Sequence, residues 1–220
     1  LQRLTLATGE VKRWRMPERI ACFALRENGG LIVAFASGIA LYDLDSGRID
    51  WIARPEEGIP TNRFNEGKCD RKGRFWAGTM DDGLKRHTGA LYRVDPDLSV
   101  HKVLDGIGIS NSTVWSLEDD VFYFADTLDG AIFRFDYDHD TGTISNRRQI
   151  VDLKGTGIGP DGSTIDAEGY LWNAQWDGWR LARYAPDGRL DRVVDLPVQK
   201  PTSCMFGGPA DDAGVCVEHG

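Results

Sequence analysis

The sequence predicts an all-β fold built from a repeated unit of about four short strands. Three observations lead to this prediction. Short apolar and aromatic runs follow turns rich in Gly and Asp, the pattern recurs along most of the chain, and no long window shows the periodicity of an amphipathic helix. A chain of 220 residues, 41% of them hydrophobic, is long enough to bury the core that such a fold needs.

The first half of the unit is an acidic or glycine-containing turn followed by an apolar run. It occurs at residues 27–34, 70–77, 118–125 and 166–174, with a weaker fifth copy at residues 211–217. The unit repeats at intervals of 44 to 49 residues when the following apolar residues are taken as equivalent: Leu31, Phe75, Phe122, Leu171 and Val215.

A second apolar run that begins with Gly follows each of the first four copies. These runs are residues 38–42, 89–93, 130–134 and 178–184. Turns such as Asp95-Pro96-Asp97 come after them, and Gly and Asp suit turns because Gly adopts positive φ and Asp bonds its own backbone. The sequence therefore predicts strands of antiparallel meanders.

A period in the mid-forties with about four strands is the size of a β-propeller blade. We predict a single β-propeller domain over residues 1–220. Residues 1–11 have the pattern of the outer half of a blade, and the chain ends after an inner strand. We therefore expect the chain to start and end in mid-blade. Either its two terminal half-blades close one blade between them, or the chain is truncated at both ends. The alternative is a β-sandwich with coincidental spacing.

The charge balance argues against several classes of partner. Asp and Glu number 34 against 26 Lys and Arg, which gives a net charge of −8 without any basic tract. We therefore expect no binding to nucleic acid or to a membrane surface. No apolar run is long enough to span a membrane, and residues 1–4 lack the layout of a signal peptide. The four cysteines form no C-x-x-C pair, so we expect reduced thiols in a cytoplasmic protein.

Two polar side chains flank Phe64. Arg63 and Asn65 would share one face of an extended segment, because alternate residues of a strand point the same way. A cation beside an amide suits a hydroxylated or carboxylated ligand. The alternative is that both side chains bond loop carbonyls.

Two further polar residues occupy similar places in successive units. Asn111 and Asp161 come 11 and 10 residues before Phe122 and Leu171, respectively. Equivalent positions in successive blades converge on the central channel, where amide and carboxylate oxygens suit a divalent cation. The alternative is an ordinary turn, since Asp161 is followed by Gly162.

Several motifs resemble those of the gluconolactonase/regucalcin family, which is also named after senescence marker protein. They occur in the same order and extend over most of residues 20–210. The motifs are residues 63–70, 73–80, 109–111, 123–127, 160–162, 166–172 and 201–209. Together they are far more specific than a single short motif.

The resemblance implies a six-bladed propeller with one divalent metal ion (Ca, Zn, Mn, Mg or Fe) in its channel. It implies that Asn111 and Asp161 are metal ligands, that Asp161 is also the general base, and that Arg63 and Asn65 contact the substrate. The implied activity is hydrolysis of a small sugar-acid lactone, gluconolactone or a pentonolactone such as arabinonolactone, to the aldonic acid. The alternative is a non-enzymatic, calcium-binding propeller.

The sequence departs from the family pattern in three places. The family's third metal ligand is a Glu in an N-terminal Glu-Gly-Pro-like motif, which has no counterpart in residues 1–220. Ser112 and Thr113 follow Asn111 where the family usually has Gly and an apolar residue, and a Cβ at position 112 restricts the backbone. A carboxylate beyond the Thr-Met motif would be Asp81 or Asp82, and neither is assigned.

Overall fold

The computed structural model describes residues 1–5, 7–207 and 215–219, so residues 211–214 of the weaker fifth repeat lie outside it. Every regular element in the described residues is a strand. The strands form four four-stranded sheets and two strand pairs. The four-stranded sheets are β3 (Ile20–Leu25), β4 (Leu31–Phe35), β5 (Gly38–Tyr42) and β6 (Ile49–Ala53); β7 (Asn62–Cys69), β8 (Phe75–Asp81), β9 (Gly89–Val94) and β10 (Val100–Ile107); β11 (Ser110–Trp115), β12 (Val121–Asp126), β13 (Ala131–Asp138) and β14 (Thr143–Asp152); and β15 (Gly159–Ile165), β16 (Leu171–Trp176), β17 (Arg180–Tyr184) and β18 (Leu190–Asp195). The pairs are β1 (Gln2–Thr5) with β2 (Glu10–Arg13), and β19 (Pro201–Phe206) with β20 (Val215–His219).

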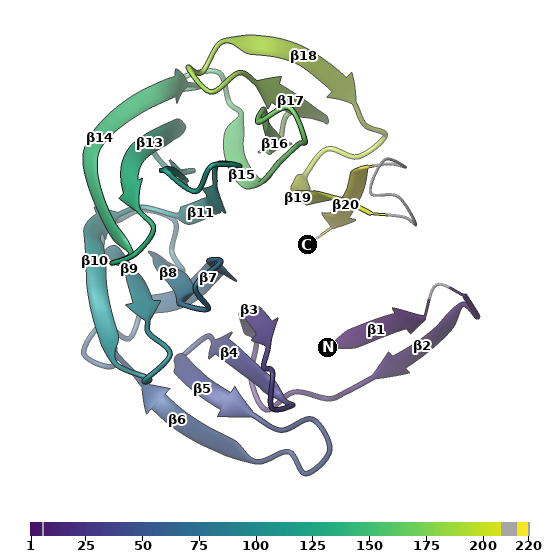
Figure 1. Cartoon of the computed structure of the whole chain (residues 1–220). Helices are drawn as coiled ribbons and strands as arrows, with labels where there is room; N and C mark the ends of the chain where they lie inside the picture. The colour runs from purple at the N-terminus through teal and green to yellow at the C-terminus, as the bar shows by residue number, and fades with distance from the viewer. Residues whose placement is uncertain (6, 208–214, 220) are drawn as a thin grey trace.

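The sheets follow one another in an arc around a common centre (Figure 1). Each four-stranded sheet is a meander of consecutive antiparallel strands. Strands β3, β7, β11, β15 and β19 lie innermost, and β6, β10, β14 and β18 lie outermost. This is the arrangement of a propeller, and the prediction of an all-β fold with a four-stranded unit is confirmed. Over the described part of the chain, no helix is suited to crossing a membrane.

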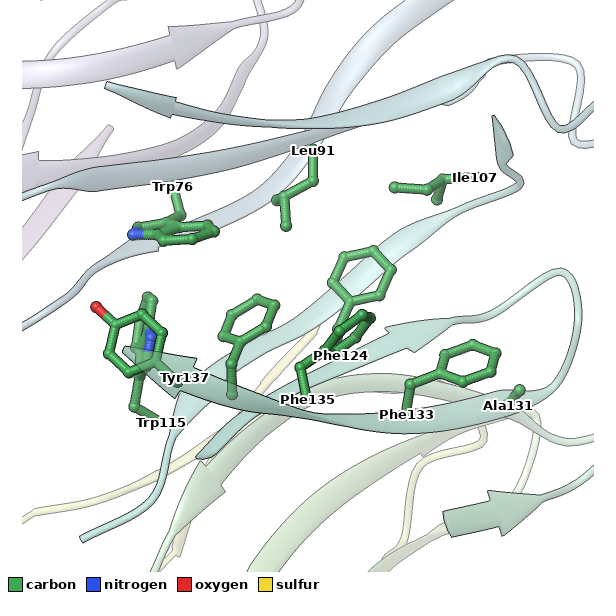
Figure 2. Close-up of a cluster of buried hydrophobic side chains, with 10 residues drawn as sticks. Trp76, Leu91, Ile107, Trp115, Phe124, Ala131, Phe133, Phe135 and Tyr137 are labelled. Atoms are coloured by element: carbon green, nitrogen blue, oxygen red, sulfur yellow. The ribbon is translucent and has the colours of Figure 1, made fainter. Parts of the chain in front are cut away.

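Aromatic side chains fill the space between the β7–β10 and β11–β14 sheets (Figure 2). Trp76 of β8 is fully buried, and its ring centroid lies 5.2 Å from that of Phe122 and 5.8 Å from that of Trp115. Burying one large apolar side chain contributes about 1.5–3 kcal/mol. The aromatic residues that mark the repeat in the sequence therefore hold neighbouring sheets together.

A buried carboxylate at the turn before β8 ties these two sheets further. Asp70 Oδ2 accepts hydrogen bonds from Arg74 Nε at 2.6 Å, from Tyr137 Oη at 2.8 Å and from Trp76 Nε1 at 3.1 Å. Its Oδ1 accepts from two backbone N–H groups of the same turn. Because Tyr137 belongs to β13, the carboxylate spans both sheets.

The turn before β16 repeats this arrangement. Asp166 Oδ2 accepts from Trp172 Nε1 at 2.8 Å and from Arg183 Nε at 2.7 Å. In the sheet between them, Ser116 takes the place of the aspartate, and its hydroxyl accepts from two backbone N–H groups of its turn. The acidic turns of the repeat are therefore structural.

All five innermost strands contain a β-bulge. The register shifts lie between Ile20 and Cys22, Phe64 and Glu66, Asn111 and Val114, Pro160 and Ser163, and Pro201 and Ser203. A bulge interrupts the alternation of side chains and turns them in new directions. Asn65 and Asp161 lie inside two of these bulges, and Asn111 borders a third.

We expect Asp70→Ala to lower the free energy of unfolding by about 3–5 kcal/mol, because it leaves the buried Arg74 guanidinium without its charge partner. Urea denaturation measures this change. The control is Asp140→Ala, which removes an exposed carboxylate that contacts Lys72, and its effect should be small. Equal losses in the two variants would contradict the structural role of Asp70.

Candidate functional site

Asn65 of β7 and Asn111 of β11 are hydrogen-bonded to each other. Asn65 Nδ2 donates to Asn111 Oδ1 at 3.2 Å and to the backbone oxygen of Ser110 at 3.0 Å. Asn111 is buried, and its Nδ2 donates to Thr127 Oγ1 at 2.8 Å. The structure therefore brings a residue expected to contact substrate next to one expected to hold a metal.

Asp161 of β15 is connected to the same group through its backbone. Thr127 Oγ1 donates to the backbone oxygen of Pro160 at 2.6 Å. The backbone oxygen of Asp161 accepts from Ser112 Oγ and, at 2.9 Å, from Asn173 Nδ2. Side chains from β11 and β16 thus fix the bulge that carries Asp161.

The Asp161 carboxyl group lies mostly out of solvent, and its charge interacts with that of Glu66 on β7. Burial, followed by the negative charge of Glu66, raises the pKa of Asp161 to about 8, against the opposing effect of the Gly162 N–H. Burial also raises the pKa of Glu66, although Lys68 and nearby backbone N–H groups oppose the shift. Glu66 Oε2 is buried and has no hydrogen-bond partner.

Glu66 is a site residue that the sequence pattern does not predict. In a regular strand it would face away from its neighbour Asn65, because successive side chains alternate. The bulge between Phe64 and Glu66 removes this alternation and brings both polar side chains toward β11. The sequence shows two adjacent polar residues, Asn65 and Glu66, but only the bulge directs both side chains toward β11.

These side chains suit a divalent cation. Asn111 offers an amide oxygen, and Asp161 and Glu66 offer carboxylate oxygens, which are the donors that hard cations prefer. The charges of the two carboxylates repel each other, and Lys68, which acts on Glu66, already donates its Nζ to a backbone oxygen of β15 at 2.6 Å. A cation between the carboxylates would relieve this repulsion.

A second group of possible metal ligands comprises His87, Asp126 and Asp129, whose ligand atoms lie within 4.8 Å of one another. Hydrogen bonds already engage these side chains. Asp126 accepts from three backbone N–H groups at 2.8 to 3.1 Å, and His87 Nε2 lies 2.8 Å from Asp129 Oδ1. We assign no metal to this group.

Arg63 connects the site to a cavity between the β3–β6 and β7–β10 sheets. Its Nη1 donates to Asn65 Oδ1 at 2.9 Å, and its Nε donates to Asp82 Oδ1 at 2.5 Å. Asp81 is buried and pairs with Arg86, so Asp82 is the carboxylate that reaches Arg63. The cavity has a volume of about 470 Å³ and is lined by Arg19, Ala36, Ser37, Pro60, Thr61, Asn62, Arg63, Asp82 and Gly83.

Ser112 occupies a backbone conformation that favours glycine. Its φ of 55° lies in the left-handed region, where a Cβ is unfavourable. The hydroxyl group provides compensating contacts, since Ser112 Oγ lies 2.7 Å from Ser163 Oγ and accepts from Asn173 Nδ2 at 3.2 Å. The departure at position 112 therefore adds a polar contact between β11 and β15.

Comparisons with known proteins show the family and the fold of this chain. Residues 1–213 match the family described as the SMP-30/gluconolactonase/LRE-like region. Regucalcin from Oryctolagus cuniculus is 41% identical over 207 residues, which cover 91% of this chain and 69% of that protein. The structure of a calcium-binding protein, regucalcin, from Agrobacterium tumefaciens superposes with a TM-score of 0.89 at 30% identity and covers 96% of this chain and 71% of that one. A gluconolactonase from Xanthomonas campestris shares the fold, with a TM-score of 0.68 at 21% identity over 85% of this chain and 65% of that one.

We expect the cation-free protein to lose stability as the pH rises. The Asp161 carboxyl has an ordinary pKa of 3.8 and a pKa of about 8 in the folded protein. Between about pH 4 and pH 8 the folded state therefore holds more protons than the unfolded state, and the stability of the fold decreases with rising pH. Melting temperatures measured across this range should fall, and Asp161→Asn should reduce the fall.

Calcium should oppose this loss, because a cation binds the ionised carboxyl groups. The increase in melting temperature on adding calcium should be larger at pH 8 than at pH 5, and smaller in Asp161→Asn. Equal increases at both pH values would show that calcium does not act at Asp161.

Proposed function

The chain belongs to the SMP-30/gluconolactonase/LRE-like family, and from this premise we propose that it catalyses the metal-dependent hydrolysis of a sugar-acid lactone, such as gluconolactone or arabinonolactone. The observation that carries the proposal is the hydrogen bond between Asn65 and Asn111, together with Thr127, which links Asn111 to the backbone just before Asp161. The proposal includes a single six-bladed propeller domain, in which β1–β2 and β19–β20 belong to separate blades.

Asn111 and Asp161 would hold one divalent cation, with Glu66 supplying a second negative charge nearby. Ca, Zn, Mn, Mg and Fe are the candidate ions. When bound, the cation would polarise the lactone carbonyl and stabilise the negative charge that develops on its oxygen. Its positive charge would also favour the ionised form of Asp161, because an opposite charge lowers the pKa of a carboxyl group.

Asp161 in its ionised form acts as the general base. It accepts a proton from the attacking water as the water oxygen bonds to the lactone carbonyl carbon. The bond between that carbon and the ring oxygen then breaks, and the ring oxygen takes a proton to become a hydroxyl group. The product is the open-chain aldonic acid.

Arg63 and Asn65 orient the lactone. Arg63 lines the cavity and also contacts Asn65, which in turn contacts Asn111. A substrate that bonds the guanidinium and the amide through its hydroxyl groups is therefore held beside the proposed cation. Neither side chain exchanges a proton in this scheme, so both act through binding and orientation.

The second candidate is a non-enzymatic calcium-binding propeller. The observation that favours it is the similarity to the Agrobacterium tumefaciens regucalcin, which is described as a calcium-binding protein. A protein that binds calcium at Asp161 but hydrolyses no lactone would support this candidate over the lactonase.

We expect Asp161→Asn to lower kcat for lactone hydrolysis by at least about a hundredfold, because the amide cannot accept the proton. Bound metal is measured in the same preparation, so that loss of the base is separated from loss of the cation. Full activity with metal retained would eliminate Asp161 as the general base.

Arg63→Ala should raise KM by about tenfold, the scale of one charge-assisted hydrogen bond, with a smaller effect on kcat. The control is Arg48→Ala, which removes an exposed guanidinium that pairs with Asp50 on the outermost strand β6 and should alter neither constant. A loss confined to kcat would contradict a binding role for Arg63.

A further inference from the structure

Arg19 and Arg63 occupy equivalent positions in neighbouring sheets. Ile20 pairs with Phe35 at the end of β4, and Phe64 pairs with Thr79 at the corresponding place on β8. Arg19 and Arg63 therefore each precede the same register position, just before the bulge of an innermost strand. The repeat places two guanidinium groups at one end of adjacent inner strands.

Both guanidinium groups bind the same carboxylate oxygen. Arg63 Nε donates to Asp82 Oδ1 at 2.5 Å, and Arg19 Nη2 donates to the same oxygen at 3.1 Å. Asp82 directly follows β8, and its side chain is 53% exposed. An ion pair this accessible to water is weak, so a ligand carboxylate can replace Asp82 while Asp82 turns into solvent.

Two other charged groups near this pair, Glu18 and Arg86, are already engaged. Glu18 accepts from the hydroxyl and the backbone N–H of Ser37, and Arg86 pairs with Asp81. Asp82 is thus the carboxylate that holds Arg19 and Arg63. Together the two arginines and Asp82 carry one net positive charge at the wall of the 470 Å³ cavity.

We propose that Arg19 and Arg63 form a subsite for a carboxylate carried by the substrate, which makes the substrate the lactone of a sugar diacid rather than of a neutral-ended sugar acid. The planar guanidinium group matches carboxylate geometry, and Asp82 shows the pair engaged with a carboxylate. Arg63 also contacts Asn65, which contacts Asn111. This chain of contacts leads from the subsite to a residue that would hold the cation, and on our proposal one ligand reaches both. This inference rests on the proposed function for the reacting end of the molecule.

The test compares kcat/KM for D-glucaro-1,4-lactone, which carries a free carboxylate, with kcat/KM for D-glucono-1,5-lactone. The protein should prefer the glucarolactone. Arg19→Gln should lower the ratio of the two values by about tenfold, the scale of one charge-assisted contact. Asp82→Asn should raise the ratio, because it removes the internal carboxylate that competes for the arginines. Arg48→Gln, the matched control, should leave the ratio unchanged.

Binding of the dicarboxylate product tests the subsite without turnover. Calorimetry in the presence of calcium should give tighter binding of glucarate than of gluconate, and Arg19→Gln should weaken glucarate binding by about tenfold. If neither lactone is hydrolysed, the proposed function fails, while this binding result still decides on the subsite. An unchanged ratio and unchanged glucarate binding in Arg19→Gln would overturn the subsite. A preference for 6-phosphogluconolactone over glucarolactone would also overturn the carboxylate subsite, because the two arginines would then bind a phosphate group.

Discussion

The candidate site depends on the β-bulges of the innermost strands, because a regular strand would send successive side chains to opposite faces. In β7 the bulge lets Asn65 reach Asn111 while its neighbour Glu66 acts on Asp161. In β15 Asp161 itself lies within the bulge. The polar groups of the site therefore come from one irregularity repeated in successive sheets, and not from a single loop.

The bulges interrupt backbone pairing, and the side chains of the site supply hydrogen bonds in its place. Inside the β15 bulge the backbone oxygen of Asp161 accepts from Ser112 Oγ and Asn173 Nδ2, and Thr127 Oγ1 donates to the backbone oxygen of Pro160 at its edge. A buried carbonyl without a donor is destabilising. The same polar side chains therefore stabilise the junctions between sheets and shape the site, so stability and ligand binding are linked in this part of the molecule.

Much of the fold is predictable from local patterns, since turn chemistry and apolar runs mark the two middle strands of each four-stranded sheet and their spacing defines the repeat. The spacing also selected Asn111 and Asp161, whose strands the structure joins through Thr127. Glu66 could not be found in this way, because its direction depends on a bulge that strand alternation does not reveal. Asp82 could not be assigned either, because its partners lie in two different sheets.

The charged groups of the two proposed sites have opposite signs. The arginine pair lines the cavity, whereas Asp161 and Glu66 lie on the innermost strands β15 and β7, in a chain with a net charge of −8. These inner carboxylates would repel an anionic ligand held by Arg63, and a cation bound between them would turn that repulsion into attraction. Linkage then requires that the ligand strengthen cation binding by the same factor by which the cation strengthens ligand binding. On the proposals above, the cation site and the arginine pair therefore act as one coupled binding unit.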